Sequence, residues 1–140
     1  MIEINFIGFN MQSKFNNVLK MANEQSEPQR LLLLFASTNE TNKSRKQSDK
    51  KGTIEPTMVV DKLPEEIASF KRLIEEADSI NKDWDFMFIA SLGGDDTGPP
   101  STEDAELFLK KMTDDIVTGN NIMRYVVFDR NENPIELSAS

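Results

Sequence analysis

The sequence predicts an α/β fold of the α+β type, with one mixed sheet in a single domain over residues 1–140. Hydrophobic residues make up 38% of the chain and charged residues 29%, which is the balance of an ordinary globular protein. The predicted elements follow the order β-α-β-β-α-β-α-β-β. Since the first six match the split βαβ order, we expect a ferredoxin-like core with an added helix and a C-terminal hairpin.

The first three elements follow from the spacing of apolar residues. Residues 2–9 alternate apolar and polar side chains, as a strand with one buried face does. Residues 11–24 have apolar residues at helical spacing, and the helix must end before Pro28. Residues 30–36 form a short continuous apolar run, which predicts a strand buried on both faces.

A long polar segment separates this strand from the next. Residues 38–52 contain no apolar side chain, so they cannot join a core, and we expect a flexible polar loop. Residues 54–60 resume a strand pattern in which Pro56 favours a position at the sheet edge. The two strands should therefore form a hairpin with a long tip.

The second half of the chain alternates helices and strands. Residues 63–80 carry one apolar stripe, with Pro64 near the predicted helix start. Residues 84–92 predict a second central strand. A helix over 101–118 is bounded by a capping box and by Gly119. The last predicted elements are the strand 122–128 and the return strand 134–137. One core should contain five of the large side chains: Phe70, Ile74, Trp84, Phe88 and Phe108.

The chain contains no histidine and no cysteine. This composition excludes histidine-dependent catalytic triads, cysteine nucleophiles, cysteine or histidine metal sites, and disulfides. The chemistry that remains must use carboxylates, hydroxyls, lysine, arginine, the backbone or a bound cofactor. A non-enzymatic binding protein fits this inventory best.

The formal net charge of −8 is unevenly distributed. Residues 43–51 hold five basic side chains and only Asp49 as an acid, so this stretch carries +4 and the rest of the chain −12. An acidic body repels phosphate and should not bind nucleic acid or an anionic membrane, except through this basic loop. It suits a partner protein with a basic surface. The alternative interpretation is that the negative charge serves solubility alone. The basic loop residues are Lys43, Arg45, Lys46, Lys50 and Lys51.

The segment 93–102 is the first candidate site, because ligands often bind where a strand leads into a helix. Asp95 and Asp96, with the hydroxyl of Thr97, are hard oxygen ligands of the kind that Mg²⁺ takes. The glycines match neither of the common phosphate-binding spacings. The alternative is a solvated acidic loop between a strand and a helix.

Acidic residues on the helix 101–118 form the second candidate site, a surface for a basic partner. Glu103, Asp104 and Glu106 lie near its start, while Asp114 and Asp115 lie at the end where the helix dipole disfavours them. A solvated helix face is the alternative reading.

A carboxylate pair could instead do acid–base chemistry. Asp83 and Asp85 flank Trp84, and an apolar neighbour can raise the pKa of a carboxyl group. The alternative interpretation places Asp83 in a turn and the Asp85 side chain toward solvent.

We therefore expect a small, acidic, cytosolic binding protein, such as an inhibitor, immunity factor or adaptor, that engages a basic surface of a partner protein. The N-terminus has no signal-peptide pattern, and no apolar run is long enough to span a bilayer. The alternative is a Mg²⁺-dependent nucleotide- or phosphate-binding domain or enzyme that uses the 93–102 loop. An assembly subunit, such as a homodimer formed through the exposed edge of the terminal hairpin, is a third option.

Overall fold

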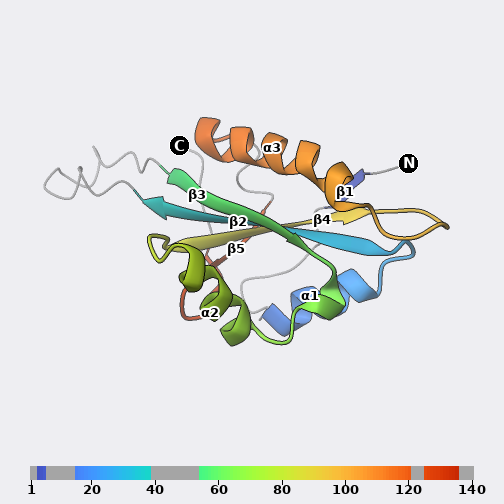
Figure 1. Ribbon diagram of the computed structural model, residues 1–140, viewed down its shortest axis with the longest axis horizontal. Helices are drawn as coiled ribbons and strands as arrows, with labels where there is room; N and C mark the ends of the chain where they lie inside the picture. The colour runs from blue at the N-terminus through green and yellow to red at the C-terminus, as the bar shows by residue number, and fades with distance from the viewer. Residues whose placement is uncertain (1–2, 6–14, 39–53, 121–124, 136–140) are drawn as a thin grey trace, which may run out of the picture.

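The computed structural model describes residues 3–5, 15–38, 54–120 and 125–135. In these residues one sheet lies between two helical layers, with α3 on one face and α1 and α2 on the other (Figure 1). The elements are β1 (Glu3–Asn5), α1 (Phe15–Asn23), β2 (Gln29–Thr38), β3 (Ile54–Lys62), the 3-10 helix η3 (Pro64–Glu66), α2 (Phe70–Ile80), β4 (Phe86–Gly93), α3 (Thr102–Thr118) and β5 (Val126–Asp129).

Five strands occupy four positions across the sheet. β3 lies at one edge and pairs with β2, and β2 pairs with β4. The other side of β4 is shared, because β5 pairs with Phe86–Ile89 and β1 pairs with residues 91–93. All four strand pairings in the described residues are antiparallel.

The α+β class and the single sheet are thus confirmed, but the described strands pair antiparallel rather than as a mixed sheet, and their order differs from the ferredoxin-like one. That order would put the first strand in the centre, whereas β1 is a three-residue strand that pairs only with β4 in the described residues. The central pair is β2 with β4. The reason is burial, since these two strands are the long, continuously apolar ones that can be covered on both faces.

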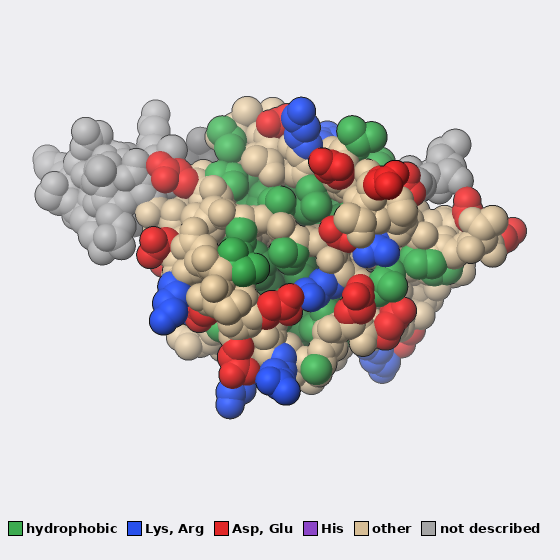
Figure 2. All heavy atoms as spheres, in the orientation of Figure 1, with side chains coloured by type: hydrophobic (Ala, Val, Ile, Leu, Met, Phe, Trp, Pro, Cys, Tyr) green, Lys and Arg blue, Asp and Glu red, His purple; other side chains and the backbone are tan. Residues whose placement is uncertain are grey.

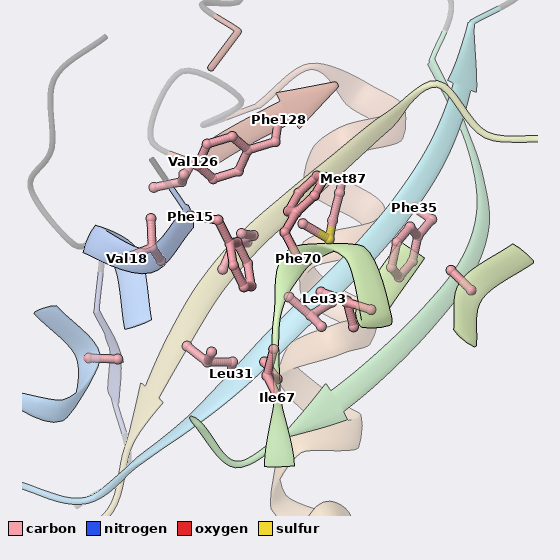
Figure 3. Close-up of a cluster of buried hydrophobic side chains, with 14 of the residues drawn as sticks. Phe15, Val18, Leu31, Leu33, Phe35, Ile67, Phe70, Met87, Val126 and Phe128 are labelled. Carbon is pink, nitrogen blue, oxygen red and sulfur yellow. The ribbon is translucent and has the colours of Figure 1, made fainter. Parts of the chain in front are cut away.

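The sheet divides the interior into two cores rather than the single core that the sequence suggested. Alternate residues of β2 point to opposite faces, so Leu31, Leu33 and Phe35 enter the cluster under α1 and α2, here called the lower core (Figure 3). Leu32, Leu34 and Ala36 enter the upper core under α3.

The five residues expected to share one core are accordingly split between the two. Phe70 and Trp84 lie in the lower core, and Ile74 packs against it. Phe88 lies in the upper core, and Phe108 packs against it.

The segment 63–80 is not one helix. Pro64 begins a single 3-10 turn, Ile67 is extended, and α2 begins only after Ser69. The Ser69 hydroxyl accepts a hydrogen bond from the Arg72 backbone N–H at 3.1 Å, as an N-cap residue does. The predicted apolar stripe is present in α2, but the helix begins only after this serine.

α3 begins and ends as predicted. The Ser101 hydroxyl accepts from the Asp104 N–H at 3.0 Å, and the Asp104 carboxylate accepts from the Ser101 N–H at 3.1 Å. At the other end Gly119 takes the left-handed conformation, with φ of 80°.

The two predicted hairpins are present as far as they are described. β2 and β3 pair along their lengths with an irregularity between Phe35 and Ala36, and Thr38 belongs to the strand rather than to the loop. The rest of the 38–52 loop lies outside the described residues. Of the C-terminal return only residues 134 and 135 are described: Pro134 forms a bridge with Phe128, and the Ile135 N–H donates to the Val127 carbonyl at 2.8 Å.

Where the chain is described, no helix combines the length and the apolar character needed to cross a membrane.

Candidate functional site

The loop between β4 and α3 is a tight, internally bonded turn. Asp95 and Gly98 exchange two backbone hydrogen bonds, of 3.1 and 3.0 Å. Gly94 lies so close to this turn that an added Cβ would come within 2.1 Å of the Gly98 carbonyl oxygen. The Gly94 N–H donates to the Pro28 carbonyl at 2.9 Å, which ties the turn to the start of β2. The glycines of this loop therefore serve its shape.

Asp95 and Thr97 stabilise the turn from within. The Asp95 Oδ1 atom accepts from the Thr97 N–H at 2.9 Å and from the Thr97 hydroxyl at 2.5 Å. These bonds, the hydroxyl bond first, lower the pKa of Asp95 below its ordinary value. Two of the three residues proposed as ligands thus satisfy each other.

Asp96, Glu103 and Glu106 are exposed, and within the described residues their carboxylates make no side-chain hydrogen bond or ion pair. Asp104 differs, because it holds the N-terminus of α3. The six predicted residues consequently divide into three with structural roles and three that face solvent.

The described part of the chain contains no group of three or more acidic side chains that could hold a metal ion. Asp95 and Asp96 are neighbours on a tight turn, and one Asp95 oxygen is already engaged by Thr97. The turn therefore offers Mg²⁺ fewer carboxylate oxygens than the sequence suggested.

A polar cluster anchors this loop and α3 to the sheet. Arg30 on β2 donates to the Pro100 carbonyl at 2.6 Å and to the Asp61 carboxylate on β3 at 2.8 Å. The Thr102 hydroxyl at the start of α3 also donates to Asp61, at 2.9 Å. The Arg30 and Asp61 side chains are only 13% and 15% exposed.

Sequence reasoning missed this cluster, because its members are far apart in the chain. The available signal was Arg30 at the head of an apolar run, where a charge needs a partner.

Acidic side chains from several segments gather around this end of the sheet. Glu27 and Glu65 line one shallow pocket together with Pro99. Asp96 and Glu103 lie on the adjoining turn and on the first turn of α3. Figure 2 shows acidic side chains around this projecting loop. We call the four carboxylates of Glu27, Glu65, Asp96 and Glu103 the acidic end.

The two acids near the end of α3 have different roles. Asp114 is exposed, but Asp115 is buried, and its Oδ2 atom accepts from the Tyr125 hydroxyl at 2.8 Å. Lys111 lies 3.9 Å from the same carboxylate. Asp115 therefore has a structural role, and its burial gives no support to a partner-binding role for it.

Tyr125 should make stability depend on pH in the alkaline range. Burial first, and then the hydrogen bond to Asp115, raise the pKa of Tyr125. The folded chain thus holds the phenol proton more tightly than the unfolded chain. This contribution is complete below the unfolded pKa of about 10 and is lost as the pH rises above it.

Tyr125→Phe should lower the free energy of unfolding at neutral pH by about 1–3 kcal/mol, because Asp115 loses its hydroxyl donor. It should also flatten the fall in stability above about pH 10. Urea unfolding at a series of pH values measures both effects. Parallel pH profiles for the parent and the variant would contradict this assignment.

Asp83 and Asp85 line one pocket beside Trp84, but their interactions in the fold are structural. The Asp85 carboxylate accepts from the Thr38 N–H at 2.9 Å and from its hydroxyl at 3.2 Å, which fastens the end of β2. Asp83 lies in a turn, where its N–H donates to Asn81.

Trp84 is buried between two other groups. Its indole N–H donates to Asp78 at 3.0 Å, and the Arg130 guanidinium lies 4.2 Å from the ring centroid. The Arg130–Asp78 ion pair, at 2.6 Å, closes this cluster.

The basic loop residues 43–51 lie outside the described residues. Comparisons with protein-family models, with curated proteins and with solved structures found no match to this chain.

Proposed function

We propose that the protein is a small cytosolic binding protein, an inhibitor, immunity factor or adaptor, whose acidic end engages a basic surface of a partner protein. The observation that carries this proposal is the convergence of exposed carboxylates from separate segments on one end of the sheet, where hydrogen bonds anchor the loop. Charge placed on a rigid scaffold costs little ordering entropy when a partner binds.

The anchoring of this end supports a binding role. Arg30 belongs to the same end, yet its guanidinium is committed to Asp61 and to the Pro100 carbonyl. It therefore does little to neutralise the exposed carboxylates of Asp96 and Glu103 on the neighbouring turn and helix. Such a surface should speed association with a basic partner and lose that advantage in salt.

The test compares two charge-reversed variants with the same net charge. One carries Glu65→Lys, Asp96→Lys and Glu103→Lys, three of the four residues of the acidic end. It spares Asp95 and Asp104 because they hold the turn and the helix cap. The matched control carries Glu75→Lys, Asp83→Lys and Asp114→Lys, at exposed positions elsewhere. Each chain is immobilised and used to capture proteins from lysate of the native source at low and high salt.

We expect a partner that binds the parent at low salt, binds the control variant, and is lost with the first variant. Equal loss with both variants would indicate a general charge effect and contradict a defined surface. Capture unchanged by the first variant would show that the acidic end is not used.

Thermal melts with Mg²⁺ and nucleotides address the alternative function. A rise in the melting temperature that requires Mg²⁺, and that Asp96→Lys removes, would favour a nucleotide- or phosphate-binding loop at 93–102.

A further inference from the structure

Within the described residues the outer edge of β3 is unpaired, since β3 pairs there only with β2. Hydrophobic side chains gather along this face of the molecule, over β3 and between α3 and α2 (Figure 2). Val59 on β3 is 40% exposed and Ile80 at the end of α2 is 66% exposed. An apolar groove beside the strand is lined by Met58, Val60 and Leu73, among others. An open edge with apolar surroundings is a site for strand addition.

We propose that the occupant is a second copy of this chain, whose β3 pairs antiparallel with β3 about a two-fold axis at Val59. Two four-position sheets would then become one continuous sheet. This inference is independent of the acidic end, and it concerns a different surface.

The apolar residues of β3 match this arrangement on both faces. Val59 lies opposite Leu34 of β2, whose side chain enters the upper core, so Val59 is on the α3 face. Met58 and Val60 pack against the lower core. A two-fold axis at Val59 puts Val59 opposite the partner's Val59, and Met58 opposite the partner's Val60. Every central pair is then apolar against apolar on the same face.

The charged ends of β3 match as well, because of the irregularity in the strand. Ala36 pairs with Pro56 while Phe35 pairs with Met58, so Thr57 is an extra residue. Counting outward from the axis across this extra residue puts Glu55 opposite the partner's Lys62. Both side chains point to the face of the sheet that carries the lower core. Their β2 partners, Ser37 and Leu31, are an even number of residues apart in β2 and therefore point to the same face. Two ion pairs would therefore close the interface symmetrically.

Lys62 already contacts Glu76 of its own chain at 2.9 Å. In the dimer its ammonium group would lie between this carboxylate and the partner's Glu55, which favours the same register.

A register shifted by two residues has its axis at Val60, and it is worse. It would put Val59 opposite the partner's Asp61 and Met58 opposite the partner's Lys62, so that apolar side chains face charged ones. Pro56 further restricts pairing, because it lacks a backbone N–H. The edge is thus suited to one register of its own sequence.

The experiment uses the absence of cysteine from the chain. Val59→Cys puts a single thiol on the proposed axis, where the two Cβ atoms of a directly opposed pair come close enough for a disulfide. Under mild oxidation this variant should form a covalent dimer at least about tenfold faster than Leu107→Cys, because pairing raises the effective thiol concentration. Leu107 is the matched control, since it is 73% exposed on α3.

Sedimentation of the unmodified chain over a concentration series is the second measurement. We expect a reversible dimer, and Val59→Lys should raise its dissociation constant at least about tenfold by opposing two lysines. Because Val59 is 40% exposed, we expect the substitution to leave the fold intact, and a melt of each variant checks this.

A chain that stays monomeric up to roughly millimolar concentration would overturn the proposal. So would a dimer that Val59→Lys does not weaken, or equal cross-linking of the two cysteine variants, since each would place the contact elsewhere.

Discussion

Replacing Phe88 with alanine should lower the free energy of unfolding by about 3–5 kcal/mol. The ring is fully buried in the upper core, on the central strand β4. It packs edge-to-face against Tyr125, with ring centroids 6.5 Å apart. The loss of stability has two parts: the lost transfer free energy of a large apolar side chain, and the cost of the cavity left behind. The sheet cannot close this cavity, because β2 and β5 hold β4 on both sides.

Urea unfolding measures this effect, and Leu107→Ala is the control. Leu107 is apolar too, but most of its surface already faces water, so its truncation should change stability by less than about 0.5 kcal/mol. A loss under about 1 kcal/mol for Phe88→Ala would contradict the assignment of this ring to a packed core.

Asp61→Asn should cost about 3 kcal/mol, close to the effect of a core truncation. The substitution keeps the size of the side chain but removes the charge that compensates the largely buried Arg30 guanidinium. It also weakens the acceptor for the Thr102 hydroxyl, so the start of α3 loses part of its attachment to the sheet. Removing one partner of a buried pair is costly because the other charge remains desolvated.

Two comparisons separate this effect from a general loss of charge. Glu24→Gln breaks the exposed Lys20–Glu24 pair and should cost less than about 0.5 kcal/mol. The double variant Arg30→Met with Asp61→Leu should lose less than the sum of its single changes, because it leaves no unpaired charge. Strict additivity would contradict the coupling inferred from the 2.8 Å contact.

Local signals in the sequence predicted the elements well. The continuous apolar run 30–36 is a strand buried on both faces, and Pro56 lies on an edge strand. Ser101, Asp104 and Gly119 bound α3 as their residue types require. These features depend on a few neighbouring residues, so short-range spacing is enough to reveal them.

The candidate site was predicted only in part, for a physical reason. Asp95 and Asp115 have the same side chain, yet Asp95 holds an exposed turn and Asp115 accepts a buried hydrogen bond from Tyr125. Which carboxylates remain available to a partner depends on donors brought close by folding.

By itself the sequence determined the central strands, both ends of α3, the acidic balance, and the absence of histidine and cysteine chemistry. The tertiary structure decided the strand order, the division into two cores and the Arg30–Asp61 contact. Spacing along the chain specifies which residues share a face of one element. The choice of neighbouring elements depends on burying both faces of β2 and β4 at the same time. Only the assembled sheet, with helices on both sides, buries both faces.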